Sequence, residues 1–316
     1  MYENKKVLLI AGGGTLGTYT GRELLRLGCY VDVVCPEEKV ADHERLRFVQ
    51  GYATEELLSS LFAENHYDGI VNFLHYQDPE EYKKAYGLLI KNTDHLIFLS
   101  SYRVYANEMH PVTEEAPRLH EVYADNAWLM EHDRYGVSKA ICEDFLFREH
   151  VGEHWTIVRP VISFSQYRLD LLLHSGDEVL RYAESGKPLP LPVAAKGLHA
   201  GLDWAGNSGK LIANLLFKPA AIGEAFSIYS GHGMTWGEVA EAYRKVIGLQ
   251  VEWVDEETYF ASSETARSKR EIMWHYDRAF DRDLDSSKVM RVSGLTPADF
   301  ATVEEGIRTE VALFKR

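Results

Sequence analysis

The most constraining feature of the sequence is a glycine-rich turn between a short apolar run and an amphipathic segment near the N-terminus. Val7–Ala11 is apolar, Gly12-Gly-Gly14-Thr-Leu-Gly17 follows it, and Leu16–Leu27 has helical periodicity. Glycines let an anionic group approach the backbone N–H groups at a helix N-terminus, where the helix dipole favours negative charge. The pattern therefore predicts a strand–turn–helix unit that binds a dinucleotide pyrophosphate. The predicted contacts are Gly12, Gly14, Thr15, Leu16 and Gly17.

Short apolar runs and longer amphipathic segments alternate through the first 160 residues. Further strands are expected at Tyr30–Cys35, Leu46–Val49, Gly69–Leu74, His95–Ser100 and Trp155–Val158, and further helices at Glu55–Glu64, Pro79–Lys91 and Tyr135–His150. Strands that alternate with helices at this spacing form βαβ units and a parallel sheet with both faces covered. The sequence therefore predicts an α/β Rossmann fold with a doubly wound parallel sheet.

The pattern changes after Pro160. We expect residues 161–202 to be loop-rich and residues 255–302 to be polar and irregular. Between and after them we expect helices at Asp203–Phe217, Thr235–Ile247 and Val303–Phe314 and a strand at Ala225–Tyr229. The predicted domains are a nucleotide-binding Rossmann domain over residues 1–160 and a smaller C-terminal substrate-binding lobe over 161–316, with some chain crossing back.

Composition excludes several classes of protein. The formal net charge of −14 argues against a nucleic-acid partner or an anionic membrane. No apolar run approaches the ~20 residues of a membrane span, and the N-terminus lacks the pattern of a signal peptide. Three cysteines without metal-type spacing fit a reducing cytoplasm, and the 13 histidines form no i,i+4 ligand pair. We therefore predict a cytoplasmic protein without a metal site.

A tyrosine and a lysine lie four residues apart in a segment that is expected to be helical. Tyr135 and Lys139 therefore share a helix face, and the ammonium group favours the ionised phenol that a general acid/base needs. The spacing alone is not specific, because Tyr2 and Lys6 have it too. The context is more specific. Ser101 follows the tip of a buried strand, where open α/β sheets place ligands, and its hydroxyl can orient a substrate oxygen against Tyr135.

Several motifs in a fixed order resemble those of the extended short-chain dehydrogenases/reductases, and most closely those of the NAD-dependent epimerase/dehydratase branch. The motifs are Ser100-Ser-Tyr-Arg-Val104-Tyr105, Pro111-Val-Thr-Glu114-Glu115-Ala-Pro117, Tyr135-Gly-Val-Ser-Lys139 with Glu143, Arg159-Pro160, Gly223-Glu-Ala-Phe226-Ser-Ile, Thr235-Trp236 and Glu304-Glu-Gly306-Ile-Arg308. The resemblance spans nearly the whole chain. It implies NAD(P)-dependent chemistry on a sugar or nucleotide sugar, with transient hydride transfer.

The resemblance also implies roles for individual residues. Tyr135 is the acid/base, Lys139 its partner and ribose anchor, and Ser101 the residue that orients the substrate hydroxyl. The implied cofactor is NAD, with NADP still open. Besides the glycine turn, the implied cofactor contacts are Cys35, Ser100, Tyr135, Lys139, Pro160 and Val161, and the candidate substrate contacts are Ser101, Tyr102, Arg168 and Arg278. Arg168 and Arg278 are candidates for binding substrate phosphates, and both side chains are expected to be exposed.

The chain departs from the family pattern at the cofactor turn. The family has glycine where Ala11 stands, and Cys35 replaces the acidic residue that grips a ribose diol, although Glu37 or Glu38 follows it. Two other functions stay open, an NADPH-dependent carbonyl reductase and a non-catalytic dinucleotide-sensing or RNA-associated protein on the same fold.

A homodimer is also expected, from the resemblance and from the apolar residues of the helix at Tyr135–His150. Val137, Ile141, Phe145 and Leu146 give this helix apolar surface for both the sheet and a partner.

Overall fold

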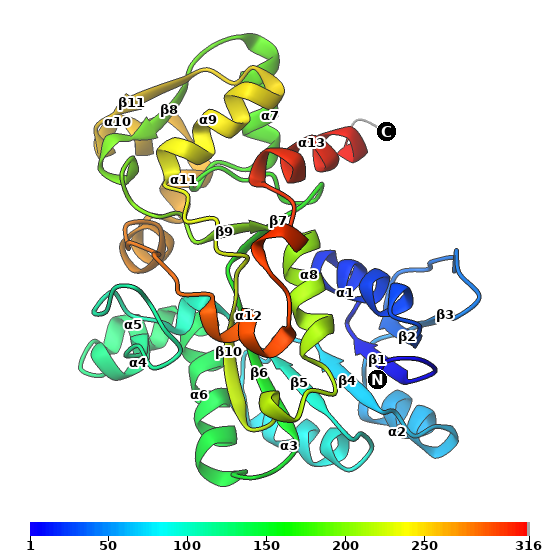
Figure 1. Ribbon diagram of the computed structural model, residues 1–316. Helices are drawn as coiled ribbons and strands as arrows, with labels where there is room; N and C mark the ends of the chain where they lie inside the picture. The colour runs from blue at the N-terminus through cyan, green and yellow to red at the C-terminus, as the bar shows by residue number, and fades with distance from the viewer. Residues whose placement is uncertain (315–316) are drawn as a thin grey trace.

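The computed structural model describes residues 1–314 and is built on a seven-stranded parallel sheet (Figure 1). The strands lie in the order β10-β6-β5-β4-β1-β2-β3, and every neighbouring pair is parallel. They are β1 (Lys6–Ile10), β2 (Tyr30–Cys35), β3 (Leu46–Gln50), β4 (Gly69–Asn72), β5 (Leu96–Leu99), β6 (Trp155–Pro160) and β10 (Glu224–Ile228). The order reverses direction between β1 and β4, where open α/β sheets leave a crevice for ligands. The predicted doubly wound Rossmann fold is confirmed.

Helices cover both faces of the sheet because its strands are apolar on both sides. In β1, Val7 and Leu9 belong to the core under α1 (Thr15–Arg26), α8 (Ala205–Leu215) and α12 (Ser287–Ser293). Leu8 and Ile10 belong to the opposite core, under α2 (Glu55–Glu64), α3 (Pro79–Ile90) and α6 (Arg134–Glu149). All four side chains are fully buried. This is the continuous apolar pattern expected of a parallel strand.

A smaller lobe lies over the carboxyl ends of the strands, at the top of Figure 1. Its elements are β7 (Ile162–Phe164), α7 (Gly176–Ser185), β8 (Leu189–Pro192), β9 (Leu202–Trp204), α9 (Trp236–Ile247), β11 (Val251–Val254), α10 (Glu256–Ser262), α11 (Glu264–Ser268), the π-helix η4 (Arg270–Arg278) and α13 (Val303–Phe314). Short elements elsewhere are η1 (Tyr102–Val104), α4 (Leu119–Val122), α5 (Ala127–His132), η2 (Val193–Ala195), η3 (Pro219–Ala221) and η5 (Pro297–Asp299). β7 pairs with β9, and β8 pairs with β11. Within residues 1–314, no helix is both long and apolar enough to cross a membrane.

Two expectations for the C-terminal half were wrong. Residues 161–202 hold β7, α7 and β8, and residues 255–302 hold α10, α11, η4 and α12. A local signal for α7 was present, because Ser175 and Glu178 form a capping box and Gly186 ends the helix at φ +69°. The helix expected from Asp203 begins two residues later, because Leu202–Trp204 is a strand.

The chain crosses back from the lobe to the sheet twice. β10 pairs with β6 and α8 packs beside α1, and later in the chain α12 packs against α8 and β10. The sheet therefore draws on residues on both sides of position 160, and the division of the chain into two domains there stays a prediction.

The turn after β1 holds an alanine in a conformation that favours glycine. Ala11 has φ +54°, and it stands where the resembling family has glycine. We expect Ala11→Gly to raise the free energy of unfolding by about 0.5–1 kcal/mol, because left-handed backbone costs an L-residue about 1–2 kcal/mol and the extra freedom of glycine in the unfolded chain offsets part of that gain. Urea unfolding measures the change. As a control, Ala85→Gly in α3 should lower stability by about 1 kcal/mol. A loss of the same size at both positions would show that Ala11 is unstrained.

Candidate active site

A cleft of about 560 Å³ lies between the carboxyl ends of the central strands and the lobe. Its wall is formed by the glycine turn, the end of β5, the start of α6, the end of β6 and the π-helix η4. It brings together most of the residues that the sequence singled out. These are Gly14, Thr15, Leu16, Gly17, Ser100, Ser101, Tyr102, Tyr135, Pro160, Val161, Arg168 and Arg278.

Gly12, Cys35 and Lys139 do not line this cleft. A Cβ at Gly12 would meet the Cβ of Leu9 at 2.7 Å, so this glycine lets the turn pack on β1. Cys35 is buried at the end of β2 and lies against Gly13, and burial raises the pKa of its thiol. Gly12 and Cys35 therefore contribute to the packing of the glycine turn on β1 and β2.

The glycine turn leaves open space at one position and none at another. A Cβ at Gly14 would have no neighbour within 4 Å, whereas one at Gly17 would collide with the backbone of Gly12. Gly14 is the N-cap of α1 and has no side chain to cap the first N–H groups. These N–H groups are the usual binding site for a phosphate at such a turn.

Lys139 lies beneath the cleft as a fully buried ammonium. Its Nζ donates to the carbonyl oxygens of Leu74, at 3.1 Å, and Leu99. Burial lowers the pKa of Lys139 to about 8, although Cys142 and Glu143 act in the opposite direction. An ammonium has three hydrogens, so one remains for a further acceptor.

Tyr135 lies at the start of α6 with 38% of its surface exposed, and its side chain lines the cleft. The ring of His75 packs against it with centroids 4.8 Å apart, and the guanidinium carbon of Arg103 is 5.9 Å from its centroid. His75 also shares a hydrogen bond of 3.1 Å with Ser138, whose hydroxyl donates to the Tyr135 carbonyl. The tyrosine is therefore held by contacts to its ring and its backbone.

The two serines after β5 differ in their hydrogen bonding. Ser101 accepts the backbone N–H of Arg103 at 3.3 Å. Ser100 is buried, and within residues 1–314 its hydroxyl has no hydrogen-bond partner. A buried hydroxyl without a partner on the wall of a cleft is explained by a ligand that supplies one.

The two arginines expected to bind phosphate have different environments. Arg168 is exposed and pairs with Asp170 at 3.3 Å. Arg278 is buried, which corrects the expectation of an exposed side chain, and it donates to the Tyr102 hydroxyl at 2.9 Å. Sequence analysis missed Arg103, Met273 and Asp277, which also line the cleft. The one signal for Arg103 was that it is the only charged residue of the motif Ser100–Tyr105.

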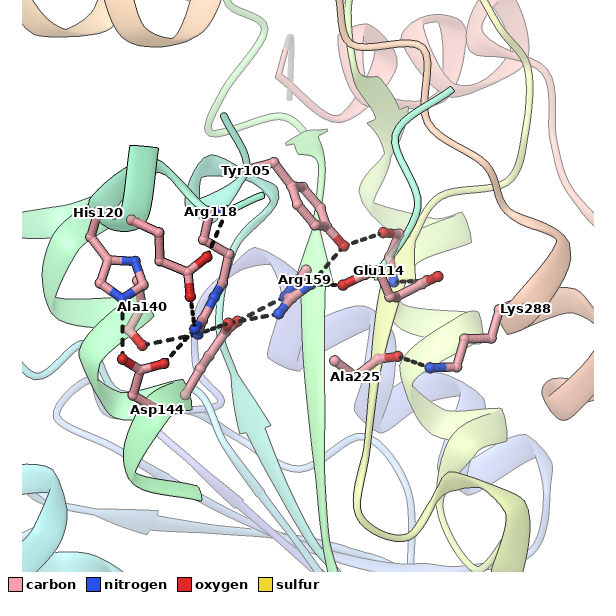
Figure 2. Close-up of polar contacts among 12 residues, drawn as sticks. Tyr105, Glu114, Arg118, His120, Ala140, Asp144, Arg159, Ala225 and Lys288 are labelled. Atoms are coloured by element: carbon pink, nitrogen blue, oxygen red, sulfur yellow. Dashed lines mark hydrogen bonds and ion pairs between the residues drawn. The ribbon is translucent and has the colours of Figure 1, made fainter. Parts of the chain in front are cut away.

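One group of side chains has the composition of a metal site. Donor atoms of His120, Glu121 and Asp144 lie within 4.8 Å of one another. Arg118 pairs with both carboxylates, and Figure 2 shows its guanidinium directed at Asp144. Because a guanidinium already neutralises these carboxylates, we interpret the group as an ion-pair network.

The buried ammonium gives a pH dependence that can be measured. The folded state holds its Lys139 proton less tightly than the unfolded chain, where the pKa is near 10.5, so stability rises with pH between these values. From about pH 8.5 to about pH 9.5, wild type should gain on Lys139→Met by about 1.4 kcal/mol in free energy of unfolding. Urea titrations at the two pH values give the difference. The exposed Lys84→Met is the control, and a Lys139→Met curve parallel to that of wild type would contradict the assignment.

Comparison with known proteins shows the fold but no close relative. No protein-family model matches the chain, and no curated protein sequence matches it. An epimerase from Methanothermobacter thermautotrophicus is 17% identical, with a TM-score of 0.74 over 99% of this chain and 93% of that one. The Bordetella bronchiseptica enzyme WbmH, solved with NAD+, is 17% identical, with a TM-score of 0.71 over 99% of both chains. A UDP-glucose-4-epimerase from Stenotrophomonas maltophila, with NAD and formylated UDP-arabinopyranose, is 15% identical, with a TM-score of 0.70 over 99% of this chain and 98% of that one. The chain therefore has the fold of these three proteins over nearly its whole length, as the sequence motifs indicated.

Proposed function

We propose that this protein is an NAD-dependent enzyme of the epimerase/dehydratase type that acts on a sugar or nucleotide sugar. The observation that carries the proposal is a single cleft in which the glycine turn at α1, Ser101 and Tyr135 meet, with Lys139 directly beneath. The fold shared with epimerases that were solved with NAD and with a nucleotide sugar supports it.

The residues of the cleft fit a dinucleotide. The open space at Gly14 leaves room for a pyrophosphate, the Ser100 hydroxyl needs a partner, and Lys139 has one hydrogen to spare. Lys139 and Tyr135 would hold the nicotinamide ribose, with Pro160 and Val161 on the adjacent wall. When bound, NAD supplies an acceptor for a hydride and returns that hydride later.

A carboxylate beside the turn favours NAD over NADP. A Cβ on Gly13 would lie 3.0 Å from Oε2 of Glu37, so this carboxylate stands over the turn that follows β1. A carboxylate there accepts hydrogen bonds from a ribose diol and repels a 2′-phosphate. Glu37 thus serves in place of the acidic residue that Cys35 replaces.

The chain's own residues then perform the proton transfer. The phenolate oxygen of Tyr135 takes the proton of a substrate hydroxyl and returns it after the carbon has changed configuration. The Ser101 hydroxyl orients the same substrate oxygen. Lys139 keeps a positive charge one helical turn from Tyr135, which stabilises the phenolate while the proton is away.

The cleft favours epimerisation over dehydration. Loss of water requires an acid that protonates the leaving hydroxyl, and Asp277 is the one carboxylate among the described residues that line the cleft. Burial acts to raise the pKa of Asp277, but Arg278, Arg103 and Arg282 outweigh it, and the net pKa lies below the usual value. Asp277 is therefore an ion-pair partner and a poor proton donor.

The cytoplasmic location and the homodimer are also part of this proposal. Three buried free cysteines suit a reducing compartment. The dimer lacks the surface that the sequence suggested, because Val137, Phe145 and Leu146 are buried within one chain and Ile141 is half-buried. A dimer would have to use other surface.

Cofactor binding is tested at Gly14. We expect Gly14→Val to abolish NAD binding and keep the fold, since a Cβ at this position meets no protein atom within 4 Å and the side chain fills the space that a pyrophosphate needs. Calorimetric titration of NAD measures the loss, with thermal melting as the check on folding. Gly87→Val, which places the same side chain in open space on α3, is the control. Unchanged affinity for NAD in a folded Gly14→Val protein would show that the glycine turn is not the NAD site.

The role of Tyr135 is tested with nucleotide sugars and less NAD than substrate. Many turnovers per NAD are expected, with a loss of about 10²–10⁴-fold in rate for Tyr135→Phe because only the proton-carrying oxygen is removed. NMR of the sugar products measures the rate. Tyr167→Phe, at a tyrosine that is 75% exposed, is the control. Full activity of Tyr135→Phe would refute the mechanism, and stoichiometric consumption of reduced cofactor would identify a reductase instead.

A further inference from the structure

At the lobe end of the cleft, three buried guanidinium groups surround a single buried carboxylate. Arg103, Arg278 and Arg282 are 5%, 3% and 2% exposed, and Asp277 is 1% exposed. Arg278 is hydrogen-bonded to Asp277, while Arg103 and Arg282 approach it at 3.8 and 3.7 Å. Tyr102 also donates to Asp277, at 2.6 Å. Asp277 therefore accepts hydrogen bonds from Tyr102 and Arg278, and Arg103 and Arg282 lie only within ion-pair distance of it.

The cluster has more positive charge and more donors than the protein balances. Asp133 takes Nη2 of Arg103 at 2.7 Å, which leaves three positive charges against two negative ones. Within residues 1–314, Nε of Arg103 and both Nε and Nη2 of Arg282 are buried without an acceptor. Buried charged donors without acceptors are costly unless another anion completes the site.

Arg103 places this excess charge beside the reacting position. Its guanidinium carbon lies 5.9 Å from the ring centroid of Tyr135, and both side chains line the cleft. Its Nη1 has only the thioether sulfur of Met273 as acceptor, at 2.9 Å. A thioether is a weak acceptor that a carboxylate would displace.

The π-helix η4 explains how the opposite wall of the cleft is built. Met273, Asp277 and Arg278 all line the cleft, at positions four and five residues apart. The Ala279 N–H donates over five residues to the Trp274 carbonyl, and the backbone is kinked at Tyr276, with φ −116° and ψ 17°. Met273 precedes this kink, and Asp277 and Arg278 follow it. The adaptable Met273 side chain therefore lines the cleft beside Arg103.

We propose that the substrate is a sugar acid, a uronate whose carboxylate is bound by Arg103 in place of Met273. The inference rests on the proposed function and specifies its substrate class. Arg103 is the residue that selects the acid over the neutral sugar. The carboxylate would accept a hydrogen bond from Nη1 of Arg103, and its negative charge would balance the cluster.

A substrate phosphate is the other anion that Arg103 could bind. The position of the phosphate in a nucleotide sugar argues against this alternative. Arg103 lies against Tyr135, so the group that it binds belongs to a carbon next to the reacting hydroxyl. In a nucleotide sugar, the phosphate sits on the anomeric carbon, and a hydroxyl on the far side of the sugar is separated from it by the ring. Arg168, which lies outside this cluster, also lines the cleft and remains for a phosphate there.

Two matched pairs of substrates distinguish a sugar carboxylate from a substrate phosphate as the anion that Arg103 binds. UDP-glucuronate and UDP-glucose, and UDP-galacturonate and UDP-galactose, carry the same diphosphate and differ in the carboxylate. With NAD present, we expect kcat/KM for the converted acid to exceed that of its neutral partner by on the order of 10²-fold, because an unfilled charged site rejects the neutral analogue. Calorimetry should give a preference of the same sign in Kd. Equal values, or a preference for the neutral sugars, would overturn the sugar-acid proposal and leave the NAD site standing.

The variant Arg103→Met shows whether this residue carries the selection. It should lose most of the preference for the acid, and Arg148→Met, at an arginine that is 70% exposed outside the cleft, should keep it. A folded Arg103→Met protein that keeps the preference would refute the role of Arg103. If this variant does not fold, melting of wild type with free galacturonate or galactose at equal ionic strength decides. Stabilisation by the acid alone supports the proposal, and equal effects refute it. This measurement needs no NAD, so its outcome is independent of the cofactor site.

Discussion

The arrangement of the site depends on one buried ion pair between α6 and β6. Arg159 donates from Nε and Nη2 to the two carboxylate oxygens of Glu143 at 2.8 and 2.7 Å, and both residues are almost completely buried. Tyr135, Lys139 and Glu143 follow one another at intervals of four residues and so lie on one face of α6. A bidentate contact fixes both position and rotation, so anchoring Glu143 also points the tyrosine and the lysine at the sheet edge. Figure 2 shows Arg159 at the centre of these contacts, which include Arg118.

The contrast between Arg159 and Arg103 separates a structural charge from a functional one. Arg159 has all its partners within the protein, because Tyr105 and the carbonyl of Glu114 take the N–H groups that Glu143 leaves. Arg103 lies just as deep but has an unpartnered Nε and a thioether as an acceptor. Within residues 1–314, Nε and Nη2 of Arg282 also lack an acceptor, but Arg282 is not part of the cleft lining. Arg103 lines the cleft, where a ligand can supply the missing acceptor.

The sequence predicted the sheet and its helices well because those elements carry strong local patterns. The glycine turn, the buried strands and the Tyr135–Lys139 spacing can each be read within a short window of residues. The lobe was harder, since its strands have only three or four residues and its π-helix follows a period that helix patterns do not match. Arg103 could not be identified as a cleft residue from sequence, because its burial depends on Asp277, which is distant in the chain. The sequence analysis identified Arg278 as a candidate substrate contact, but it did not predict that this side chain is buried.

The same distinction explains why fold similarity at 15–17% identity leaves the substrate open. The glycine turn and the α6 face are local patterns, so a distant relative can keep them while the rest of the sequence changes. The arginine cluster instead joins η1 after β5 to η4 in the lobe, and the contacts of Tyr102 and Arg103 with Asp277 cross between elements far apart in the chain. A single substitution in either element alters its charge balance without disturbing the glycine turn or the Tyr135–Lys139 pair. Under the proposed function, the group that the cluster binds could therefore change while the neighbouring Tyr135–Lys139 pair stays the same.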